Sequence, residues 1–493
     1  MKIVLVNLSS KISSDGSRLI SALLKRAGYS VTNIFLARSN PFFDDLNELS
    51  QLNPILEQSQ LVLIGVYSSY VAAAIQITEY IHEYFPEIKV VWGGPHCIAE
   101  PEMALEFADG VCFSEGDEAV VDFVDKMDKG NDYFNTPNMA FRKDGQLIIN
   151  ETLPPFKDLD SLPHYDYDFG NTYLLDKQLI PLNKKILKER FACYPFYKPA
   201  FYFLSSRGCP NRCTYCNNAR YISIFGKKPI RFHSVNRIIS ELQTSLAQFD
   251  FFEYIVLSDD DFFMRPLDQI EDFAKQYKEK IGIPLGVAVS PNTYNSKKMK
   301  LLVKAGLRFI QMGVQTGSQR VLDDVFHRNT DVRKTLTVIR ELAEYKKSDN
   351  VDLLVDFIID NPYEMREDVY LTYRSLLELP LQVIVNIFYL TFFPGTPLYD
   401  KAVRDGYTEA FGQKTSRLRF FTRQGLKVRY QKNYEMFLIL LVKKLRLHCI
   451  DHQFLYRRLI PLAVFRFLGI KPLRAISSLF QESFYTFLLK KID

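Results

Sequence analysis

Three cysteines, Cys209, Cys213 and Cys216, lie within eight residues of this chain in the spacing Cys-x3-Cys-x2-Cys. They follow the apolar run 201–204, which predicts a short strand. Three thiolates on one loop can each bind one iron of a four-iron cluster. The fourth iron then has no protein thiolate nearby and stays open to a substrate or cofactor. The loop therefore indicates catalysis rather than electron storage.

The competing interpretation of the cysteine loop is a structural zinc site. Such sites are normally closed by four protein ligands. His233 lies seventeen residues beyond Cys216 and stands alone, so it does not complete a zinc motif. Cys193 could in principle be a fourth ligand, but a small buried thiol fits it better. The sequence thus favours the iron–sulfur cluster, and a non-catalytic metal-binding protein stays open as the other class.

Length and composition limit the classes of protein that fit. The chain has 493 residues, of which 47% are hydrophobic, so about three domains with packed cores are expected. The seven cysteines are odd in number and partly clustered, which argues against a disulfide framework and for a reducing compartment. The apolar run 3–6 is too short for a secretory signal and fits a buried strand. We therefore expect a cytoplasmic protein.

Strands and helices alternate over residues 1–130, the first expected domain. The strands are expected at 3–6, 31–35, 61–66, 89–92 and 110–113. Such alternation predicts a parallel, doubly wound, Rossmann-like α/β sheet. Ligands of such sheets bind beyond the carboxyl ends of the strands, where this chain has the loops 67–70, 93–96 and 114–117, which contain small residues and glycines. No Gly-x-Gly-x-x-Gly follows the first strand, so nucleotide binding by that motif is not expected.

Six further strand–helix units are expected over residues 199–404. Their strands are predicted at 201–204, 254–257, 285–289, 309–314, 351–359 and 383–391. Repeated units of this kind favour a partial barrel, (β/α)6, whose active site lies on the loops after the strands. The cysteine loop follows the first of these strands and so belongs to the catalytic face. Three adjacent carboxylates, 259–261, follow the second strand, and at least one should face a cation or a hydrogen-bond donor.

These features together resemble the radical SAM superfamily. The Cys-x3-Cys-x-aromatic-Cys loop is its signature, and the polar strand ends follow in the matching order. The resemblance implies a [4Fe-4S] cluster on the three cysteines. It implies contacts to S-adenosylmethionine (SAM) from Tyr215, Asp260, Gln315, Ser318 and Ile359. It also implies reductive cleavage of SAM to methionine and a 5′-deoxyadenosyl radical, which abstracts hydrogen from an unactivated C–H bond.

The first domain is similar to the cobalamin-binding domain that precedes many radical SAM domains. The similarity rests on residues 90–96 and 113–118. It implies cobalamin contacts from Ser68, Ser69, Gly93, Gly94, Glu115 and Gly116. After the first strand the chain departs from the pattern, because residues 7–11 read Asn-Leu-Ser-Ser-Lys instead of Asp-x-His-x-x-Gly. A histidine from that segment therefore does not hold cobalamin, and a domain with this fold but without cobalamin stays an alternative.

Two segments lie outside these domains. The proline-rich, acidic stretch 154–163 predicts an extended linker within residues 131–198. The last segment, 405–493, is basic, with 17 Lys and Arg against four Asp and Glu from residue 411 onward. Its apolar runs are shorter than a transmembrane helix. We expect helices that cap the barrel or lie on an anionic membrane surface, and no nucleic acid binding, because the basic residues alternate with large aliphatic ones.

The sequence therefore predicts a radical SAM enzyme that methylates an unactivated carbon with the help of cobalamin. A radical SAM cyclase, rearrangement or C–C coupling enzyme without methyl transfer is the alternative. Methylthiotransferases fit less well, because they carry a second three-cysteine cluster and the first domain offers only Cys97 and Cys112. The expected partners are a small-molecule, lipid or peptide substrate and an electron donor such as flavodoxin or ferredoxin.

Overall fold

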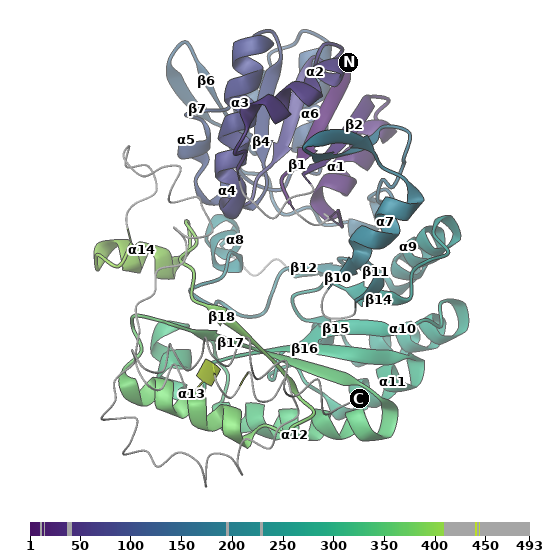
Figure 1. Cartoon of the computed structure of the whole chain (residues 1–493), viewed down its shortest axis with the longest axis vertical. Helices are drawn as coiled ribbons and strands as arrows, with labels where there is room; N and C mark the ends of the chain where they lie inside the picture. The colour runs from purple at the N-terminus through teal and green to yellow at the C-terminus, as the bar shows by residue number, and fades with distance from the viewer. Residues whose placement is uncertain are drawn as a thin grey trace, which may run out of the picture. The chain divides into compact units, whose positions relative to one another are not determined.

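The computed structural model of the chain describes residues 1–9, 12–13, 15–36, 42–193, 197–226, 230–408, 439–440 and 443 (Figure 1). These residues form two compact units. The first contains Met1–Ile310, Phe326–Arg328 and the segment that begins at Thr391, and the second contains Gln311–Val325 and Asn329–Leu390. None of the described helices is long and apolar enough to cross a membrane. Nearly all of the basic C-terminal segment, and with it the helices expected there, lies outside the described residues.

The first unit begins with a nine-stranded sheet in the order β7-β6-β5-β4-β3-β1-β2-β8-β9. Its central strands β1 (Lys2–Asn7), β2 (Ser30–Leu36), β3 (Leu61–Gly65), β4 (Lys89–Gly93) and β5 (Gly110–Cys112) are parallel. They match the five predicted strands. The helices α1 (Asp15–Arg26), α3 (Val71–Tyr84) and α6 (Ala119–Asp128) alternate with these strands, as predicted. The doubly wound prediction is confirmed for this domain.

The alternation of apolar side chains explains why both faces of this sheet are covered. Val62 and Ile64 of β3 pack into one core with α3, whereas Leu61 and Leu63 pack into a second core with α6. Successive residues of a strand point to opposite faces, so an unbroken apolar run must be buried on both sides. The fully buried Trp92 donates its indole N–H to Thr78 of α3 at 2.9 Å, which satisfies the polar atom of the largest core side chain.

The segment 131–198 contains more structure than an extended linker. The hairpin β6 (Met139–Lys143) and β7 (Gln146–Ile149) joins β5, and the hairpin β8 (Thr172–Asp176) and β9 (Gln178–Pro181) joins β2. Between the hairpins, residues 150–158 form neither helix nor strand, as their proline content predicts, and a short 3-10 helix, η4 (Leu159–Ser161), follows within the predicted linker. The hairpins were not predicted, because their outer strands β7 and β9 are mostly exposed and none of the four strands carries a long apolar run.

The next part of the first unit starts the predicted barrel. Strands β11 (Lys198–Phe203), β14 (Tyr254–Leu257) and β15 (Leu285–Val289) pair in parallel. They alternate with α9 (Val235–Gln248), α10 (Leu267–Lys280) and α11 (Ser296–Ala305). A short ribbon, β12 (Ser206–Arg207) and β13 (Arg231–Phe232), and the helix α8 (Asn218–Phe225) lie after β11.

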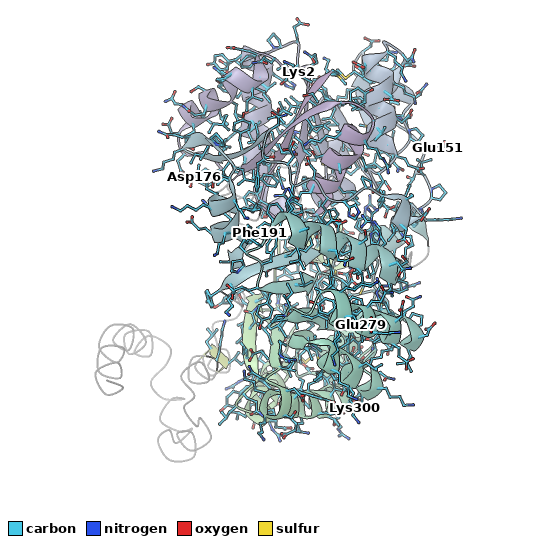
Figure 2. All side chains as sticks on the ribbon, turned by 90° about the vertical axis from the view of Figure 1, so that its right-hand side faces the viewer. Lys2, Glu151, Asp176, Phe191, Glu279 and Lys300 are labelled. Carbon is cyan, nitrogen blue, oxygen red and sulfur yellow. The ribbon has the colours of Figure 1, made fainter. Side chains whose placement is uncertain are left out.

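Aromatic side chains pack together beside β11. Phe191, labelled in Figure 2, ends the helix α7 (Lys184–Phe191) and meets Phe252 edge-on, with ring centroids 5.1 Å apart. Tyr167 of the interdomain segment packs against Phe201 and Phe249 at 5.7 and 5.6 Å. Such aromatic contacts add to the burial of the rings. These contacts fix the segment 131–198 to the start of the barrel within the first unit.

The second unit holds the later strand–helix units. Strand β16 (Leu307–Gln315) begins in the first unit and ends in the second. It is followed by α12 (Val332–Asp349), β17 (Asp352–Ile359), α13 (Arg366–Glu378) and β18 (Ile384–Tyr389), and β17 and β18 pair in parallel. The helix α14 (Pro397–Arg404) belongs to the first unit again. All six predicted barrel strands are present, so the (β/α)6 prediction is confirmed.

Candidate active site

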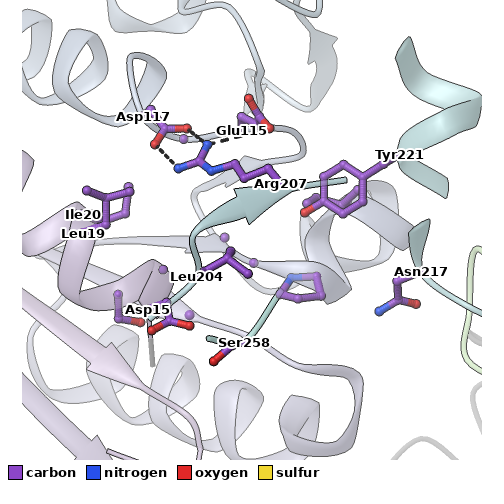
Figure 3. Close-up of a pocket in the computed structure, with 18 of the residues that line it drawn as sticks. Asp15, Leu19, Ile20, Glu115, Asp117, Leu204, Arg207, Asn217, Tyr221 and Ser258 are labelled. Carbon is purple, nitrogen blue, oxygen red and sulfur yellow. Dashed lines mark hydrogen bonds and ion pairs between the residues drawn. The ribbon is translucent and has the colours of Figure 1, made fainter. Parts of the chain in front are cut away.

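A cavity of about 910 Å³ lies in the first unit, beyond the carboxyl ends of β3, β4 and β5. One wall consists of the loops that follow these strands, and another is the loop that follows β11 (Figure 3). Of the residues predicted for a site, the cavity is lined by Cys209, Cys216, Tyr215, Asp260, Gly93, Gly94, Glu115 and Gly116. The structure therefore brings together two sets of residues that were predicted for two different cofactors.

The cysteine loop is anchored by its backbone. Gly208 has a φ of 96°, a left-handed conformation that suits glycine, and it turns the chain from β12 into the loop. The N–H of Thr214 donates to the carbonyl of Phe326 at 3.0 Å, and the carbonyl of Thr214 accepts from the N–H of Leu398 at 2.9 Å. These two bonds hold the middle of the loop to segments that are far away in the sequence.

Each cysteine sulfur accepts a hydrogen bond from a nitrogen. The side-chain amides of Asn211 and Asn218 donate to Cys209 and Cys216, each at 3.8 Å. Arg328 donates to the sulfur of Cys213 at 3.6 Å. Burial raises the pKa of Cys209 to about 12 and that of Cys216 to about 11, so both are thiols without a metal and binding one would release protons.

Arg328 also reaches the aromatic residue of the signature loop. Its guanidinium donates to the Tyr215 hydroxyl at 3.5 Å. The Tyr215 ring packs against Phe326, with ring centroids 4.7 Å apart and an angle of 70° between the planes. Desolvation is the main cause that raises the pKa of Tyr215 well above its usual range. Tyr215 is therefore a fixed, uncharged aromatic wall beside the loop.

The three carboxylates after β14 have three different roles. Asp259 is buried and accepts from the backbone N–H groups of Ser205 and Ser206 at 2.6 and 2.8 Å. Asp261 is buried, caps the following turn and accepts from Thr293 at 2.6 Å. Only Asp260 lines the cavity, where it accepts from Asn218 at 3.0 Å. Desolvation raises the pKa of Asp260, and its free lone pairs can accept from a ligand's amino group.

Glycines are frequent where the first domain lines the cavity. Gly65, Gly93, Gly94 and Gly116 all line it. Gly94 has a φ of 96°, and a Cβ there would lie 3.0 Å from the carbonyl oxygen of Val66, so only glycine fits without strain. The buried Ser68 instead bonds His96 at 3.1 Å, and neither it nor Ser69 lines the cavity. Burial lowers the pKa of His96 to about 3, so this histidine stays neutral.

Two arginines bind the acidic loop after β5. The guanidinium of Arg207 donates to both carboxylate oxygens of Asp117, at 2.7 and 2.8 Å, as Figure 3 shows. Arg231 forks onto both carboxylate oxygens of Glu115 at 2.9 and 2.6 Å. Glu115 also accepts from the N–H of Phe156 at 2.8 Å. The carboxylate of Glu115, a residue predicted to contact cobalamin, is thus bound to the protein, although Glu115 lines the cavity.

The remaining predicted SAM contacts belong to the second unit. Gln315 ends β16 with a φ of 74°. The buried Ser318 donates its hydroxyl to Asp368 of α13 at 2.5 Å, and Arg320 binds the same carboxylate. Ile359 is the buried last residue of β17. The side chain of Ser318 therefore has a structural bond of its own, and any contact to a ligand would come from its backbone.

The described residues fit the cofactors that the motifs imply. No three His, Cys, Asp or Glu side chains among them are arranged around a single metal ion. A [4Fe-4S] cluster makes a different demand, because each thiolate binds its own iron and N–H groups stabilise the sulfurs. The nitrogen donors beside all three cysteines meet that demand. For cobalamin, the wall of glycines beyond β3, β4 and β5 leaves room for a large, flat ligand to approach the backbone.

Several of these residues were not predicted from the sequence. Arg328 lies 115 residues from Cys213, and no local pattern marks it. Arg207 and Asp117 are 90 residues apart, although an arginine beside a cysteine loop and an acidic Glu-Gly-Asp loop offered complementary charges. Asn211 and Asn218 stand next to the cysteines and could have been proposed as donors to sulfur. Tyr67 lines the cavity where Ser68 and Ser69 were expected.

Comparisons with known proteins agree with this geometry. Residues 1–124 match the B12 binding domain and residues 203–376 match the radical SAM superfamily. An uncharacterized methyltransferase of Pyrococcus horikoshii is 24% identical over 443 residues, covering 86% of this chain and 87% of the relative.

Solved structures show the same fold. The radical SAM methyltransferase TsrM of Kitasatospora setae, with cobalamin and a [4Fe-4S] cluster bound, has a TM-score of 0.63 at 15% identity, covering 82% of this chain and 75% of that one. The cobalamin-dependent SAM radical enzyme OxsB has a TM-score of 0.61 at 16% identity, covering 82% and 55%. The chain thus combines a B12-binding domain with a radical SAM domain, and the solved structures that share its fold are cobalamin-dependent radical SAM enzymes.

Proposed function

We propose that this chain is a cobalamin-dependent radical SAM methyltransferase that methylates an unactivated carbon. The observation that carries this proposal is the single cavity shared by the cysteine loop and the glycine loops. A shared cavity allows a radical formed at one cofactor and a methyl group held by the other to meet one substrate. The similarity over most of the chain to a relative named as a methyltransferase supports methyl transfer.

Each set of residues has a proposed role. Cys209, Cys213 and Cys216 hold the cluster. SAM is bound by Tyr215, Asp260, Gln315, Ser318 and Ile359, with Asp260 accepting from its amino group. Cobalamin is held by the backbone of Gly93, Gly94, Glu115 and Gly116, with Tyr67 beside them and Ser68 and Ser69 holding the loop after β3.

When bound, these groups supply an electron that cleaves SAM to methionine and a 5′-deoxyadenosyl radical, and a methyl group for the substrate. The chain itself positions the reactants and excludes water from them. Asn211, Asn218 and Arg328 stabilise negative charge on the sulfurs through their N–H groups. Tyr215 and Phe326 form an apolar wall beside them, and Arg328 keeps that wall in place.

The partners follow from this chemistry. A one-electron reductant must reach the cluster, and a flavodoxin or ferredoxin is our proposal for it. The substrate is proposed to be a small molecule, a lipid or a peptide with an unactivated C–H bond. For the basic segment 405–493 we propose either a cap on the barrel or contact with an anionic membrane surface, in a cytoplasmic enzyme.

The test is anaerobic purification and reconstitution of the full chain. We expect four irons, four sulfides and one cobalamin per chain, by metal analysis and mass spectrometry. Reduction in the presence of SAM should yield 5′-deoxyadenosine, and SAM with a deuterated methyl group should pass that label to cobalamin.

Two variants sharpen this test. Cys213→Ala should lose the cluster and SAM cleavage, whereas Cys97→Ala, in the buried core of the first domain, should keep both. SAM cleavage without bound cobalamin would favour a cyclase, rearrangement or coupling enzyme instead. Zinc in place of iron and sulfide would overturn the enzyme assignment altogether.

A further inference from the structure

The ribbon β12–β13 places two positive charges side by side. Ser206 pairs with Phe232 and Arg207 pairs with Arg231 in its antiparallel register. Like charges on directly paired residues of neighbouring strands are destabilising. The ribbon therefore needs nearby anions, and the loop after β5 supplies them as Glu115 and Asp117.

The four charges form a neutral network of two bidentate pairs. Arg207 forks onto Asp117, and Arg231 forks onto Glu115 and also donates to the carbonyl of Phe156 at 2.6 Å. A longer contact of 3.8 Å joins Arg207 to Glu115 and links the two pairs. All four side chains are less than one-fifth exposed. Bidentate pairs of this kind fix both distance and orientation.

Stability alone does not account for this network. Partly buried ion pairs gain little over well-packed apolar residues, because desolvation of the charges offsets their attraction. Nor is Arg207 needed to hold the ribbon to the barrel. Asp259 already does so, by accepting from the N–H groups of Ser205 and Ser206. The positive charge of the buried Arg265 nearby stabilises the Asp259 carboxylate.

The position of the network gives it a different consequence. Arg207 lies two residues before Cys209, and Asp117 follows Gly116 of the glycine wall. All four charged residues line the shared cavity. Loss of the bidentate ion pair between Arg207 and Asp117 would therefore move the start of the cysteine loop relative to the loops of the first domain.

We infer that Arg207 and Asp117, supported by Arg231 and Glu115, are positioning residues that set the spacing between the cluster and cobalamin. This inference rests on the proposed function and deepens it. Neither side chain has to touch a reacting atom. Their role is to keep the cysteine loop and the loop after β5 at a fixed distance and orientation. A small displacement of reactants can slow a reaction by about a hundredfold.

The experiment measures that spacing directly in the full chain loaded with both cofactors. With the cluster reduced and cobalamin in its paramagnetic Co(II) state, electron paramagnetic resonance detects the magnetic coupling between them. In Arg207→Gln we expect a weaker or broader coupling than in the parent, at unchanged iron and cobalamin content. The rate of methyl transfer from SAM to reduced cobalamin, followed optically, should fall by at least about tenfold.

Further variants separate positioning from a general loss of stability. Arg207→Lys keeps the charge but not the fork, so its coupling should be intermediate. A double variant that exchanges the two residues, Arg207→Asp with Asp117→Arg, should restore part of the parent coupling. Arg340→Gln breaks an exposed ion pair to Glu378 of 2.9 Å and should leave the coupling unchanged. Where Arg207→Gln does not keep both cofactors, Asp117→Asn is measured in its place.

The outcomes distinguish this inference from the proposed function. A parent protein that binds no cobalamin would refute the proposed function. A parent that binds both cofactors, with the same coupling in Arg207→Gln and Asp117→Asn, would overturn the positioning role. The positioning role would also be overturned if the variants lost thermal stability but kept the parent coupling. It would likewise be overturned if both single variants lost coupling and the double variant recovered none of it.

Discussion

At the scale of the residue, identical side chains acquire different roles from their surroundings. Three consecutive aspartates follow β14, yet two are used inside the protein and only Asp260 faces the cavity. The difference comes from the donors nearby. Asp259 meets two backbone N–H groups and Asp261 meets a turn and a threonine, whereas Asp260 meets one side-chain amide. A ligand is thus offered one carboxylate rather than three.

Arg328 is expected to tune the cluster rather than to hold it. Its guanidinium brings a positive charge and an N–H donor to the sulfur of Cys213. Both stabilise the more negative, reduced state of a cluster. Arg328→Gln should therefore keep the iron content and lower the midpoint potential by on the order of tens of millivolts, measured by spectroelectrochemical titration. Arg333→Gln, on the exposed side of α12, is the control, and equal potentials in all three proteins would refute the prediction.

Asp15 gives the protein without cofactors a pH-dependent stability. Desolvation by burial raises the pKa of Asp15 to about 8, the charge of Arg18 opposes this rise, and Glu241 and Asp259 add to it. In the unfolded chain the same carboxyl ionises near pH 4. Between these values the unfolded state gives up its proton and the folded state retains it, so stability falls as pH rises from about 4 to 8.

Asp15→Ala should remove this dependence. The variant should gain stability over the parent progressively from pH 4 to pH 8, by on the order of a few kcal/mol at pH 8. Chemical denaturation at pH 5 and pH 8 measures the effect. Glu271→Ala, on the exposed face of α10, should leave the free energy of unfolding unchanged at both pH values. If Asp15→Ala and the parent differed in stability by the same amount at pH 5 and pH 8, Asp15 would not be the source of the pH dependence.

At the scale of the element, the loop after β16 is built by close contact with α13. A Cβ at Gly317 would lie 2.6 Å from the carbonyl oxygen of Leu371 and 2.7 Å from the Cα of Thr372. The N–H of Gly317 donates to the Thr372 hydroxyl at 3.0 Å. The backbone of this loop therefore lies directly on the helix, and the proposed SAM contacts at Gln315 and Ser318 depend on that approach.

Gly317→Ala should separate this loop from α13. The added methyl group meets backbone, which cannot rotate away, so we expect a loss of about 1–3 kcal/mol or more in the free energy of unfolding. Gly16→Ala is the matched control, because no atom lies within 4 Å of a Cβ there and alanine favours a helix. Urea denaturation of both variants measures the difference; a Gly317→Ala protein as stable as the parent would show that the loop can move.

At the scale of the whole molecule, ligand binding and stability are coupled. A ligand that binds only the folded chain stabilises it by about 2.7 kcal/mol at one hundred times its dissociation constant. Hydroxocobalamin should therefore raise the melting temperature of the protein by several degrees. Gly93→Leu places a side chain in the cavity and should abolish the rise. Ala27→Leu, at an exposed position after α1, should keep it; a rise that persists in Gly93→Leu would place cobalamin elsewhere.

The sequence predicts those parts of the molecule that local patterns encode. Buried strands rich in apolar residues, such as β3 and β17, and the cysteine loop with its aromatic residue, carry their signal within a few residues. The contacts that complete the site do not. Arg328 reaches Cys213 across 115 residues and Arg207 reaches Asp117 across 90, so only the folded chain shows them. The hairpins β6–β7 and β8–β9 were missed because their pairing partners, rather than their own composition, make them strands.

Those two hairpins determine where a fragment that contains the first domain can end. β7 and β9 are the outermost strands of the first sheet, each four residues long and mostly exposed, and β9 ends in a proline. Short, polar or proline-ended border strands discourage other chains from adding on. A fragment that stops near residue 130 would leave the hydrogen-bonding groups of β2 and β5 bare and invite aggregation. The soluble cobalamin-binding piece of this enzyme should therefore extend through Pro181.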